Sequence, residues 1–433
     1  MLDIKFIREN ASEVQEKSKQ KGYEVDVEQL LGQDELRRNL LKQAEDLRSR
    51  RKEFNSQAKG SRPSDEQIQQ GKKLREDLEK IETKLSKTDA KFMKLLKAVP
   101  NMPLGDVPVG AGENENVVTK TVGQPTKFDF EAKNHAQIAD GKDWLDKERA
   151  AKVAGSRFAY LKGDLVRMQF AIVQFVINTL SDENKLQEII DGANLNISPK
   201  AFVPVIPPAI VNTVAYEATA RLDAENVTYK LADDDMWLNA SAEHSLCNMY
   251  MNEIIPKSKL PIRYVGYSTS FRREAGTYGK DTEGMFRMHQ FDKLEMEVFS
   301  DAESGYQEHK FMVAIQEYLV RQLGLPYRVL QKCTADIGHP NAQGVDIEVW
   351  MPGQDAYRET HSADYMTDYQ ARRLQTRYKN EDSGPTQFVH TNDATALVLS
   401  RIPVAIIENF QTKDGDVIVP EVLRPFMQGK EKI

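Results

Sequence analysis

Two stretches near the start of the chain repeat apolar residues with the spacing of a coiled coil. The first lies within residues 28–58, and its apolar members are Leu40, Ala44, Leu47 and Phe54. The members of the second are Leu74, Leu78, Ile81, Leu85, Phe92, Leu95 and Val99. Arg51 and Thr88 occupy the polar positions within the two series. Gaps of three and four residues place such side chains on one narrow stripe, so the pattern predicts two long helices.

The segment KGSRPSDEQ, residues 59–67, separates these two helices. Gly60 and Pro63 interrupt a helix, and Ser64 followed by Gln67 is the sequence of a capping box. Two long helices joined by so short a turn run antiparallel. Because each has only one narrow apolar stripe, we expect the pair to project as an arm. A structural or dimerising coiled coil has the same pattern.

The pattern changes after AVPNMPLGDVPVG, residues 98–110, whose Pro and Gly residues indicate a linker. Short runs typical of strands follow, such as PIRYVGYSTSF at 261–271. Helical stretches lie between them without regular alternation, so we predict an α+β fold with a mainly antiparallel sheet flanked by helices. The predicted domains are residues 1–110, which contain the arm, and residues 111–433.

The charge is divided unevenly along the 433 residues, whose formal net charge is −7. Residues 1–100 hold 23 Lys and Arg against 19 Asp and Glu, whereas the remaining residues hold 36 against 47. A basic segment beside an acidic body fits a nucleic-acid-binding arm on an enzyme domain. It fits a solvated pair of charged helices equally well.

The cysteines, histidines and apolar runs exclude several classes of protein. Cys247 and Cys333 are far apart, which excludes a disulfide framework and a zinc-binding cysteine cluster. The histidines lack HExxH spacing. The most apolar stretch, Phe170–Leu180, is too short to span a bilayer, and the first residues lack the apolar region of a secretory signal. We therefore expect a reduced, cytoplasmic protein with no membrane partner.

The stretch FRREAGTYGKDTEGMFRMHQFDKLE, residues 271–295, combines arginines, glutamates and aromatic residues in an expected strand, loop and strand. The forked guanidinium of Arg272 can bind phosphate oxygens at two points. Glu274 lies two residues further on, so we expect it to share a strand face with Arg272. Phe291 offers a ring on which a nucleobase can stack. These residue types together predict a nucleotide site.

This stretch resembles motif 2 of the class II aminoacyl-tRNA synthetases, and the whole chain resembles the seryl-tRNA synthetase family. The strings that carry the resemblance are, in family order, MLDIKFIREN, SRFAYLKGDL, LPIRYVGYSTSFRREAG, RMHQFDKLEMEVF, VDIEVWMPGQDAYRE, DYQARR and DGDVIVPEVLRPFM. The resemblance implies a class II synthetase-type antiparallel sheet with an N-terminal antiparallel coiled-coil arm. It also implies ATP-dependent activation of L-serine and transfer of the seryl group to the 3′ end of serine tRNA. Selenocysteine tRNA remains open as a second acceptor.

The resemblance assigns roles in the ATP site. Arg272 would bind the α-phosphate and the serine carboxylate, Glu274 the adenine amino group and Arg287 the terminal phosphates. Phe291 would stack on adenine. Arg401 matches the motif 3 arginine at the start of a helix, where a cation opposes the helix dipole and a phosphate-binding role explains its position. Arg272 and Arg401 are therefore the implied catalytic residues.

The resemblance also implies Mg²⁺ as cofactor. Glu359 and Ser362 in YRETHS match the metal-side residues, and Mg²⁺ prefers oxygen ligands. Asp346 and Glu348 in VDIEVW occupy alternate strand positions, which either line the site or form an ordinary polar face.

The implied serine pocket contains Ser241, Glu243, Arg272, Glu295 and Thr395. A site that hydrogen-bonds the substrate hydroxyl rejects alanine strongly, because a buried acceptor would otherwise stay unpaired. The implied arm would hold the long variable arm of serine tRNA through basic residues near its tip, namely Lys59, Arg62, Lys72, Lys73 and Arg75. PVIPP, with Pro207 and Pro208, lies where motif 1 builds the dimer interface, so a homodimer is implied.

Several strings depart from the family pattern, mostly around the amino-acid pocket. The segment that usually contains TGQ reads EATARLDAE, and the TAE triplet begins with Ser241. KTYDLE becomes QGVDIE, with Gln343 and Val345 in place of lysine and tyrosine. SSCSN becomes HSADY, with Ala363 and Tyr365 in place of cysteine and asparagine, and LNGSG becomes NDATA. ATP binding is therefore the firmer expectation, and strict serine specificity the weaker one.

Two alternatives remain at this stage. The first is a synthetase-like ligase with another acceptor or an altered amino-acid specificity. The tRNA-type arm argues against this alternative. The second is a non-catalytic interaction protein derived from a synthetase. The retained arginines and glutamates of the expected ATP site argue against this alternative.

Overall fold

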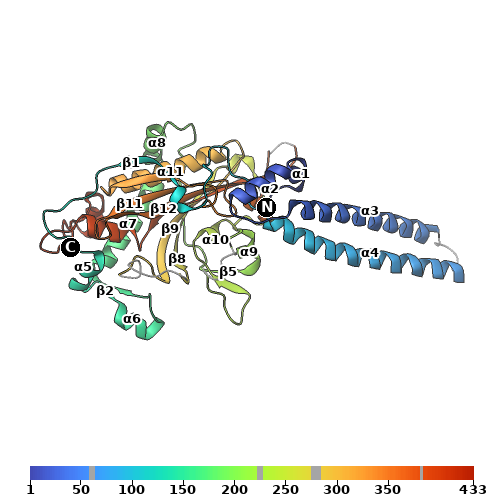
Figure 1. Ribbon diagram of the computed structural model, residues 1–433, viewed down its shortest axis with the longest axis horizontal. Coiled ribbons are helices and arrows are strands. Elements are labelled where there is room, and N and C mark those ends of the chain that lie inside the picture. The colour runs from blue at the N-terminus through green and yellow to red at the C-terminus, as the bar shows by residue number, and fades with distance from the viewer. Residues whose placement is uncertain (58–63, 222–227, 275–283, 381–383) are drawn as a thin grey trace. The chain divides into compact units, whose positions relative to one another are not determined.

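The computed structural model describes residues 1–57, 64–221, 228–274, 284–380 and 384–433 (Figure 1). It divides the chain into two compact units, Met1–Met102 and Pro103–Ile433. This boundary lies within the predicted linker, residues 98–110, whereas the sequence predicted it at the end of that linker. The reason is that the linker is bonded to the second unit: the Leu104 N–H donates to the Ala342 carbonyl at 2.9 Å, and the Thr334 N–H to the Pro108 carbonyl at 2.9 Å.

The first unit is helical. Its helices are α1 (Ile4–Glu9), α2 (Ala11–Gln20), α3 (Val27–Gln57) and α4 (Asp65–Ala98). The predicted capping box starts α4, because the Gln67 N–H donates to Ser64 Oγ and the Gln67 side chain accepts from the Ser64 N–H. Buried Asp34 on α3 accepts from Arg8 on α1 at 2.7 Å, which ties the short helices to the long pair.

The two long helices pack along the predicted stripes. Leu40 and Ala44 on α3 and Leu78 and Phe92 on α4 are buried. Leu96 is buried and Leu95 only half-buried, so the stripe shifts by one residue near the end of α4. Ion pairs cross between the helices from Arg37 to Asp89 at 2.5 Å and from Arg48 to Glu82 at 2.8 Å. The prediction of an antiparallel coiled-coil pair is confirmed.

The second unit is built on an eight-stranded sheet with the order β1-β10-β11-β12-β15-β9-β8-β4. The strands are β1 (Val117–Val122), β10 (Tyr327–Gln331), β11 (Gln343–Met351), β12 (Ala356–Thr367), β15 (His390–Val398), β9 (Gln290–Ser300), β8 (Ile262–Phe271) and β4 (Val203–Val205). Among these strands only the edge pair β4–β8 is parallel. The predicted mainly antiparallel sheet is confirmed.

Helices and three small sheets surround the large sheet. The helices are α5 (His135–Gly141), α6 (Lys147–Ala154), α7 (Gly163–Leu180), α8 (Glu183–Gly192), α9 (Thr213–Ala218), α10 (Glu243–Leu246), α11 (Gly305–Gln322), α12 (Tyr369–Leu374) and α13 (Ile402–Asn409). The short strands are β2 (Leu145–Asp146), β3 (Tyr160–Leu161), β5 (Ile210–Asn212), β6 (Met236–Leu238), β7 (Ile254–Pro256), β13 (Arg377–Lys379) and β14 (Gln387–Phe388). No helix within the described ranges is long and apolar enough to cross a membrane.

The two faces of the large sheet differ in chemistry because side chains alternate along each strand. Leu294, Met296 and Val298 of β9 point into the main core, which also contains residues of α7, α11 and α13. Helix α11 lies along this face and contacts β9, β12 and β15 (Figure 1). Glu295 and Glu297 alternate with these apolar residues, so β9 turns its carboxylates to the opposite face.

Candidate active site

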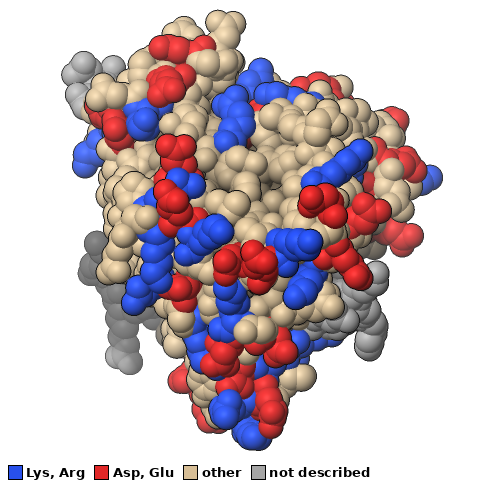
Figure 2. Space-filling view, turned by 90° about the vertical axis from the view of Figure 1, so that its left-hand side faces the viewer, with Lys and Arg blue, Asp and Glu red and all other residues tan. Residues whose placement is uncertain are grey.

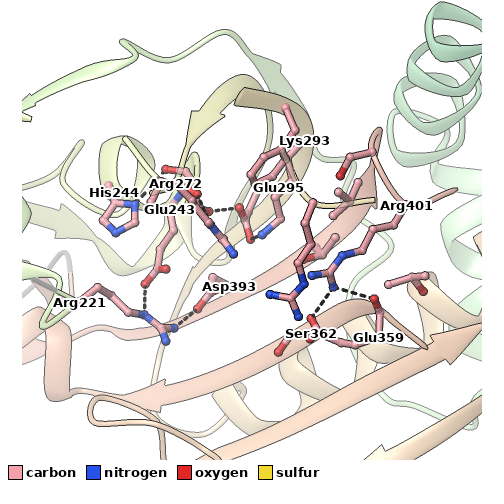
Figure 3. Close-up of a pocket in the computed structure, with 18 of the residues that line it drawn as sticks. Arg221, Glu243, His244, Arg272, Lys293, Glu295, Glu359, Ser362, Asp393 and Arg401 are labelled. Atoms are coloured by element: carbon pink, nitrogen blue, oxygen red, sulfur yellow. Dashed lines mark hydrogen bonds and ion pairs between the residues drawn. The ribbon is translucent and has the colours of Figure 1, made fainter. Parts of the chain in front are cut away.

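Every residue that the sequence assigned to the ATP and serine sites lines one cavity of about 330 Å³ (Figure 3). These residues are Ser241, Glu243, Arg272, Glu274, Arg287, Phe291, Glu295, Glu359, Ser362, Thr395 and Arg401. They come from β9, β12 and β15, from α10 and from the segments beside these elements. The polar face of the sheet therefore forms the floor of the cavity.

Arg272 and Glu274 line the cavity, but they do not lie on a strand as the sequence predicted. Strand β8 ends at Phe271, so the two residues do not share a strand face. The Arg272 N–H still donates to the His289 carbonyl at 2.9 Å, and Arg272 Nε donates to the Ala240 carbonyl at 3.1 Å. Glu274 has a positive φ of 46°, which ends the extended course of the chain. The following loop, 275–283, lies outside the described residues.

Aromatic and acidic partners hold these arginines in place. The Arg272 guanidinium lies 5.4 Å from the centre of the Phe291 ring. Arg287 Nη1 lies 3.2 Å from Glu274 Oε2. Phe291 and Ser270 are cross-strand neighbours on β9 and β8, so the hairpin that carries Arg272 also carries its aromatic partner.

Arg401, Glu359 and Ser362 lie together at one end of the cavity, on the right of Figure 3. Arg401 is the N-cap residue of α13, as the sequence predicted. Its Nη1 donates to the Glu359 carbonyl at 2.6 Å and lies 3.3 Å from Glu359 Oε1. Its guanidinium also lies 5.3 Å from the centre of the Phe286 ring. These contacts hold the Arg401 guanidinium over β12 at the start of α13, where the helix dipole alone would repel a cation.

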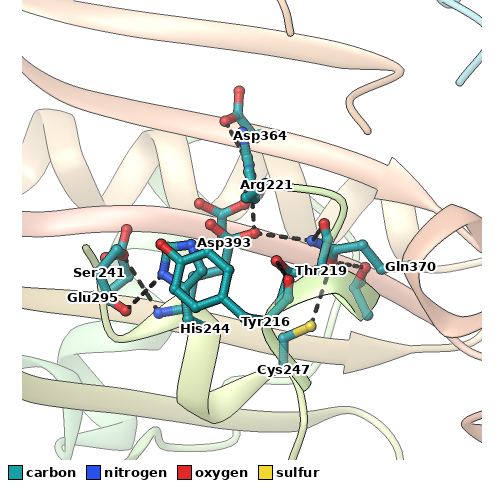
Figure 4. A network of polar contacts seen from close by, with 12 residues as sticks. Tyr216, Thr219, Arg221, Ser241, His244, Cys247, Glu295, Asp364, Gln370 and Asp393 are labelled. Atoms are coloured by element: carbon teal, nitrogen blue, oxygen red, sulfur yellow. Dashed lines mark hydrogen bonds and ion pairs between the residues drawn. The ribbon is translucent and has the colours of Figure 1, made fainter. Parts of the chain in front are cut away.

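Carboxylates, a hydroxyl and an arginine occupy the other end (Figure 4). Buried Glu295 accepts from Ser241 Oγ and, at 2.5 Å, from Lys293 Nζ. Buried Glu243 accepts from Arg221 Nε at 3.1 Å and from Gln370 Nε2 at 2.9 Å. Burial opposes ionisation of Glu243, but Arg221 and the other nearby donors outweigh it and lower its pKa. Glu243 is therefore an anion at neutral pH.

His244 shows how tightly this end is packed. Its ring stacks on Tyr216 with the ring centres 4.3 Å apart, and its Nδ1 lies 3.1 Å from the Ser241 carbonyl. Burial lowers the pKa of His244, so the ring is neutral at pH 7. The His244 ring therefore adds no positive charge beside Glu243.

Sequence reasoning missed the cavity residues Arg221, Lys332, Asp364 and Asp393. The only signal for Arg221, Asp364 and Asp393 was that their strings depart from the family pattern, whereas Lys332 lies in none of those strings. Conversely, Asp346 and Glu348 are not among the described residues that line the cavity. Glu348 pairs with Arg328, and Asp346 Oδ2 lies 3.7 Å from Lys332 Nζ.

The basic residues assigned to tRNA are only partly described. Lys72, Lys73 and Arg75 are exposed on α4, whereas Lys59 and Arg62 lie outside the described residues. On the face shown in Figure 2, basic and acidic side chains are intermixed, and neither sign covers a large area. That face therefore has no broad field of one sign that would attract a polyanion.

Comparison with known proteins decides the family. Residues 1–103 match the seryl-tRNA synthetase N-terminal domain, and residues 228–410 match the tRNA synthetase class II core domain (G, H, P, S and T). The chain is 39% identical to a serine–tRNA ligase of Thermodesulfovibrio yellowstonii over 99% of both chains. The chain belongs to the seryl-tRNA synthetase family. A serine–tRNA ligase of Nitrosopumilus maritimus is 35% identical over the full length of both chains.

Solved structures of the seryl-tRNA synthetase family have the same fold. The structure of the seryl-tRNA synthetase from Pyrococcus horikoshii complexed with ATP matches with a TM-score of 0.87 and 34% identity, over 100% of this chain and 99% of that one. The cytoplasmic serine–tRNA ligase of Naegleria fowleri in complex with AMP matches with a TM-score of 0.83 and 28% identity, over 100% of this chain and 98% of that one. The class II fold expected from the sequence is therefore confirmed.

Proposed function

We propose that this protein is a serine–tRNA ligase. It activates L-serine with ATP to form seryl-adenylate and then transfers the seryl group to the 3′ end of serine tRNA. The observation that carries the proposal is the two-ended cavity. Arginines that suit phosphates lie at one end, a hydroxyl and carboxylates that suit a small amino acid lie at the other, and Arg272 lies beside these carboxylates in the same cavity (Figure 3). The similarity to serine–tRNA ligases along the whole chain supports it.

In the first step a carboxylate oxygen of serine attacks the α-phosphorus of ATP, and the bond to pyrophosphate breaks. The nucleophile belongs to the substrate, so the protein contributes alignment and charge stabilisation. Arg272 neutralises the α-phosphate and orients the serine carboxylate. Arg287 and Arg401 hold the terminal phosphates, which keeps the leaving group in line.

The remaining cavity residues bind adenine, the metal and serine. Phe291 stacks on adenine, and the Glu274 carboxylate accepts from its amino group. Glu359 and Ser362 present oxygen donors from β12, a donor set that fits Mg²⁺ bound mainly by phosphates and water. Mg²⁺ supplies positive charge that stabilises the phosphate oxygens. Ser241 and Glu243 bind the serine amino group, and Glu295 with Thr395 reads its hydroxyl.

The first unit provides the tRNA arm in this proposal. Lys72, Lys73 and Arg75 lie exposed on α4 near the turn between the long helices, where they can bind backbone phosphates. The second unit provides catalysis, and both reactions take place in the cytoplasm, where ATP and tRNA are available. Use of selenocysteine tRNA would require no other cavity residue, because the same seryl group is transferred.

A homodimer is part of the same proposal. Four large apolar side chains in and beside β4, β5 and α9 are exposed: Val203, Ile206, Ile210 and Val214. Ile206 is 83% exposed and Val214 68%. Exposed apolar side chains concentrated in one short segment indicate an interaction surface, and β4 is an edge strand.

Replacing Ile206 and Val214 with aspartate is expected to convert the dimer to a monomer, because two buried charges would stay unpaired at the interface. Size-exclusion chromatography with light scattering measures the mass. The control is Val153→Asp on α6, where an equally exposed apolar residue (73%) lies outside the segment 203–214. A wild-type protein that is already monomeric would contradict the proposed dimer.

Amino-acid-dependent exchange of pyrophosphate into ATP tests the function directly. Exchange with serine, followed by charging of serine tRNA, is the expected result. Exchange with serine but no charging of any tRNA would favour a ligase with another acceptor. No exchange with any amino acid would favour a non-catalytic interaction protein.

A further inference from the structure

Three of the strings that depart from the family pattern meet at one point of the cavity (Figures 3 and 4). Arg221 belongs to EATARLDAE, Asp364 to HSADY and Asp393 to NDATA. Arg221 Nη2 lies 3.2 Å from Asp364 Oδ2 and 3.1 Å from Asp393 Oδ1. The Arg221 string lies more than a hundred residues before the other two, and the changes bring one guanidinium to two carboxyl groups.

The sheet explains why the cation is needed. Asp364 of β12 lies directly opposite Asp393 of β15, and Asp393 lies directly opposite Glu297 of β9. Like charges at opposed positions on neighbouring strands destabilise a sheet. Burial and the neighbouring acids raise the pKa of Glu297 well above its usual range, so Glu297 stays protonated. Burial and the neighbouring acids also raise the pKa of Asp393, and Arg221 offsets the negative charge that the two aspartates carry.

A fourth departure makes room for the cluster. Gly344 of QGVDIE lies opposite Asp364, and a Cβ atom added to it would lie 2.9 Å from Asp364 Oδ1 and 2.9 Å from Lys332 Cδ. A side chain at position 344 would displace Asp364 or Lys332. The glycine therefore belongs to the same set of changes as the acids.

Arg221, Asp364 and Asp393 all line the cavity, and Arg221 is the most exposed of the three. Its side chain is 23% exposed, whereas the side chains of Asp364 and Asp393 are each 9% exposed. Its Nε also holds the carboxylate of Glu243 at 3.1 Å. The surface that a bound amino acid meets at this end therefore combines one guanidinium with the carboxylates that hold it.

We propose that Arg221, held by Asp364 and Asp393, is a specificity-determining residue that closes the side-chain end of the amino-acid pocket. The inference rests on the proposed function, because it concerns the pocket that takes serine. A guanidinium locked by three carboxylates cannot move away from a larger side chain. The pocket therefore admits a hydroxymethyl group and rejects the additional methyl group of threonine.

The experiment compares kcat/KM for serine and threonine in pyrophosphate exchange with the full-length protein. The test variant combines Arg221→Gln, Asp364→Ser and Asp393→Asn, which restores residues of the TGQ, SSCSN and LNGSG strings and removes the two aspartates together with their arginine. Glu243 loses the Arg221 guanidinium in this variant but keeps the hydrogen bond from Gln370. We expect its preference for serine over threonine to fall about tenfold or more, the size of discrimination that one methyl group provides. The KM for ATP should stay unchanged, because the arginines of the ATP end are untouched.

The single variant Arg221→Gln separates specificity from simple structural support. It leaves Asp364 and Asp393 facing each other without the guanidinium. We therefore expect the single variant to have a lower kcat/KM for serine than the triple variant, in which both aspartates are also replaced. Arg328→Gln is the matched control, because Arg328 also pairs with a cross-strand acid, Glu348, in the same sheet. An unchanged preference in the triple variant would overturn the role of Arg221. Absence of exchange with serine in the wild type would instead overturn the proposed function.

Discussion

Replacing Arg272 with alanine is expected to lower the rate of serine activation by about 10²–10³-fold, or about 2.7–4 kcal/mol of transition-state stabilisation. Arg272 carries a delocalised charge in the cavity, where negative charge develops on the α-phosphate in the proposed reaction. Its guanidinium is held against Phe291 and by the Ala240 carbonyl, so its position is set before substrate binds. Pre-set donors of this kind need little reorganisation during the reaction.

Pyrophosphate exchange with saturating serine and ATP measures this loss. Arg272→Lys should recover part of the rate, because it restores the charge but not the forked pair of donors. Arg328→Ala is the matched control: Arg328 also stacks on an aromatic ring, Tyr357 at 5.0 Å, and also pairs with an acid, Glu348. Near-normal turnover in Arg272→Ala, with melting temperatures equal to wild type, would show that Arg272 is only structural.

Shortening the arm is expected to abolish tRNA charging and to leave serine activation nearly unchanged. The deletion removes residues 49–81 and joins Arg48 to Glu82 through a short glycine–serine linker. The ion pair between Arg48 and Glu82 shows that these residues already face each other across the two helices. The pair between Arg37 and Asp89 lies in the part that remains. The deletion removes every proposed phosphate contact of the arm, whereas the cavity belongs to the other compact unit.

Exchange and charging assays on the same preparation provide the comparison. Replacing Lys72, Lys73 and Arg75 with alanine should weaken tRNA binding and reduce its salt dependence, because fewer counterions are released on binding. The matched control replaces Lys91 and Lys94, which are equally exposed on α4 but lie near its C-terminal end. Equal loss of both reactions in the shortened protein would contradict an independent tRNA arm.

The arm was predictable from sequence because its structure depends on neighbouring residues. The three-and-four spacing determines which side chains lie on one stripe, and Ser64 with Gln67 determines where α4 begins. The residues proposed for the ATP and serine sites could also be named from the sequence, because the motif strings that resemble the family contain them, and all of them line one cavity. The placement of Arg272 and Glu274 on one strand face was wrong, since β8 ends one residue before Arg272. A strand end depends on which hydrogen bonds the next strand offers, and a single segment does not contain that information.

The sequence by itself therefore determined the helical arm, the mainly antiparallel sheet and the residues of the nucleotide end. Only the tertiary structure decided how the serine end is built. In the sequence Arg221, Asp364 and Asp393 are unrelated departures, and each alone would bury an uncompensated charge. The pairing of β12 with β15 brings the two aspartates together, and the chain after α9 brings Arg221 over them. The balance of charge in this pocket depends on which residues the strand register places opposite one another, and the local sequence does not specify that register.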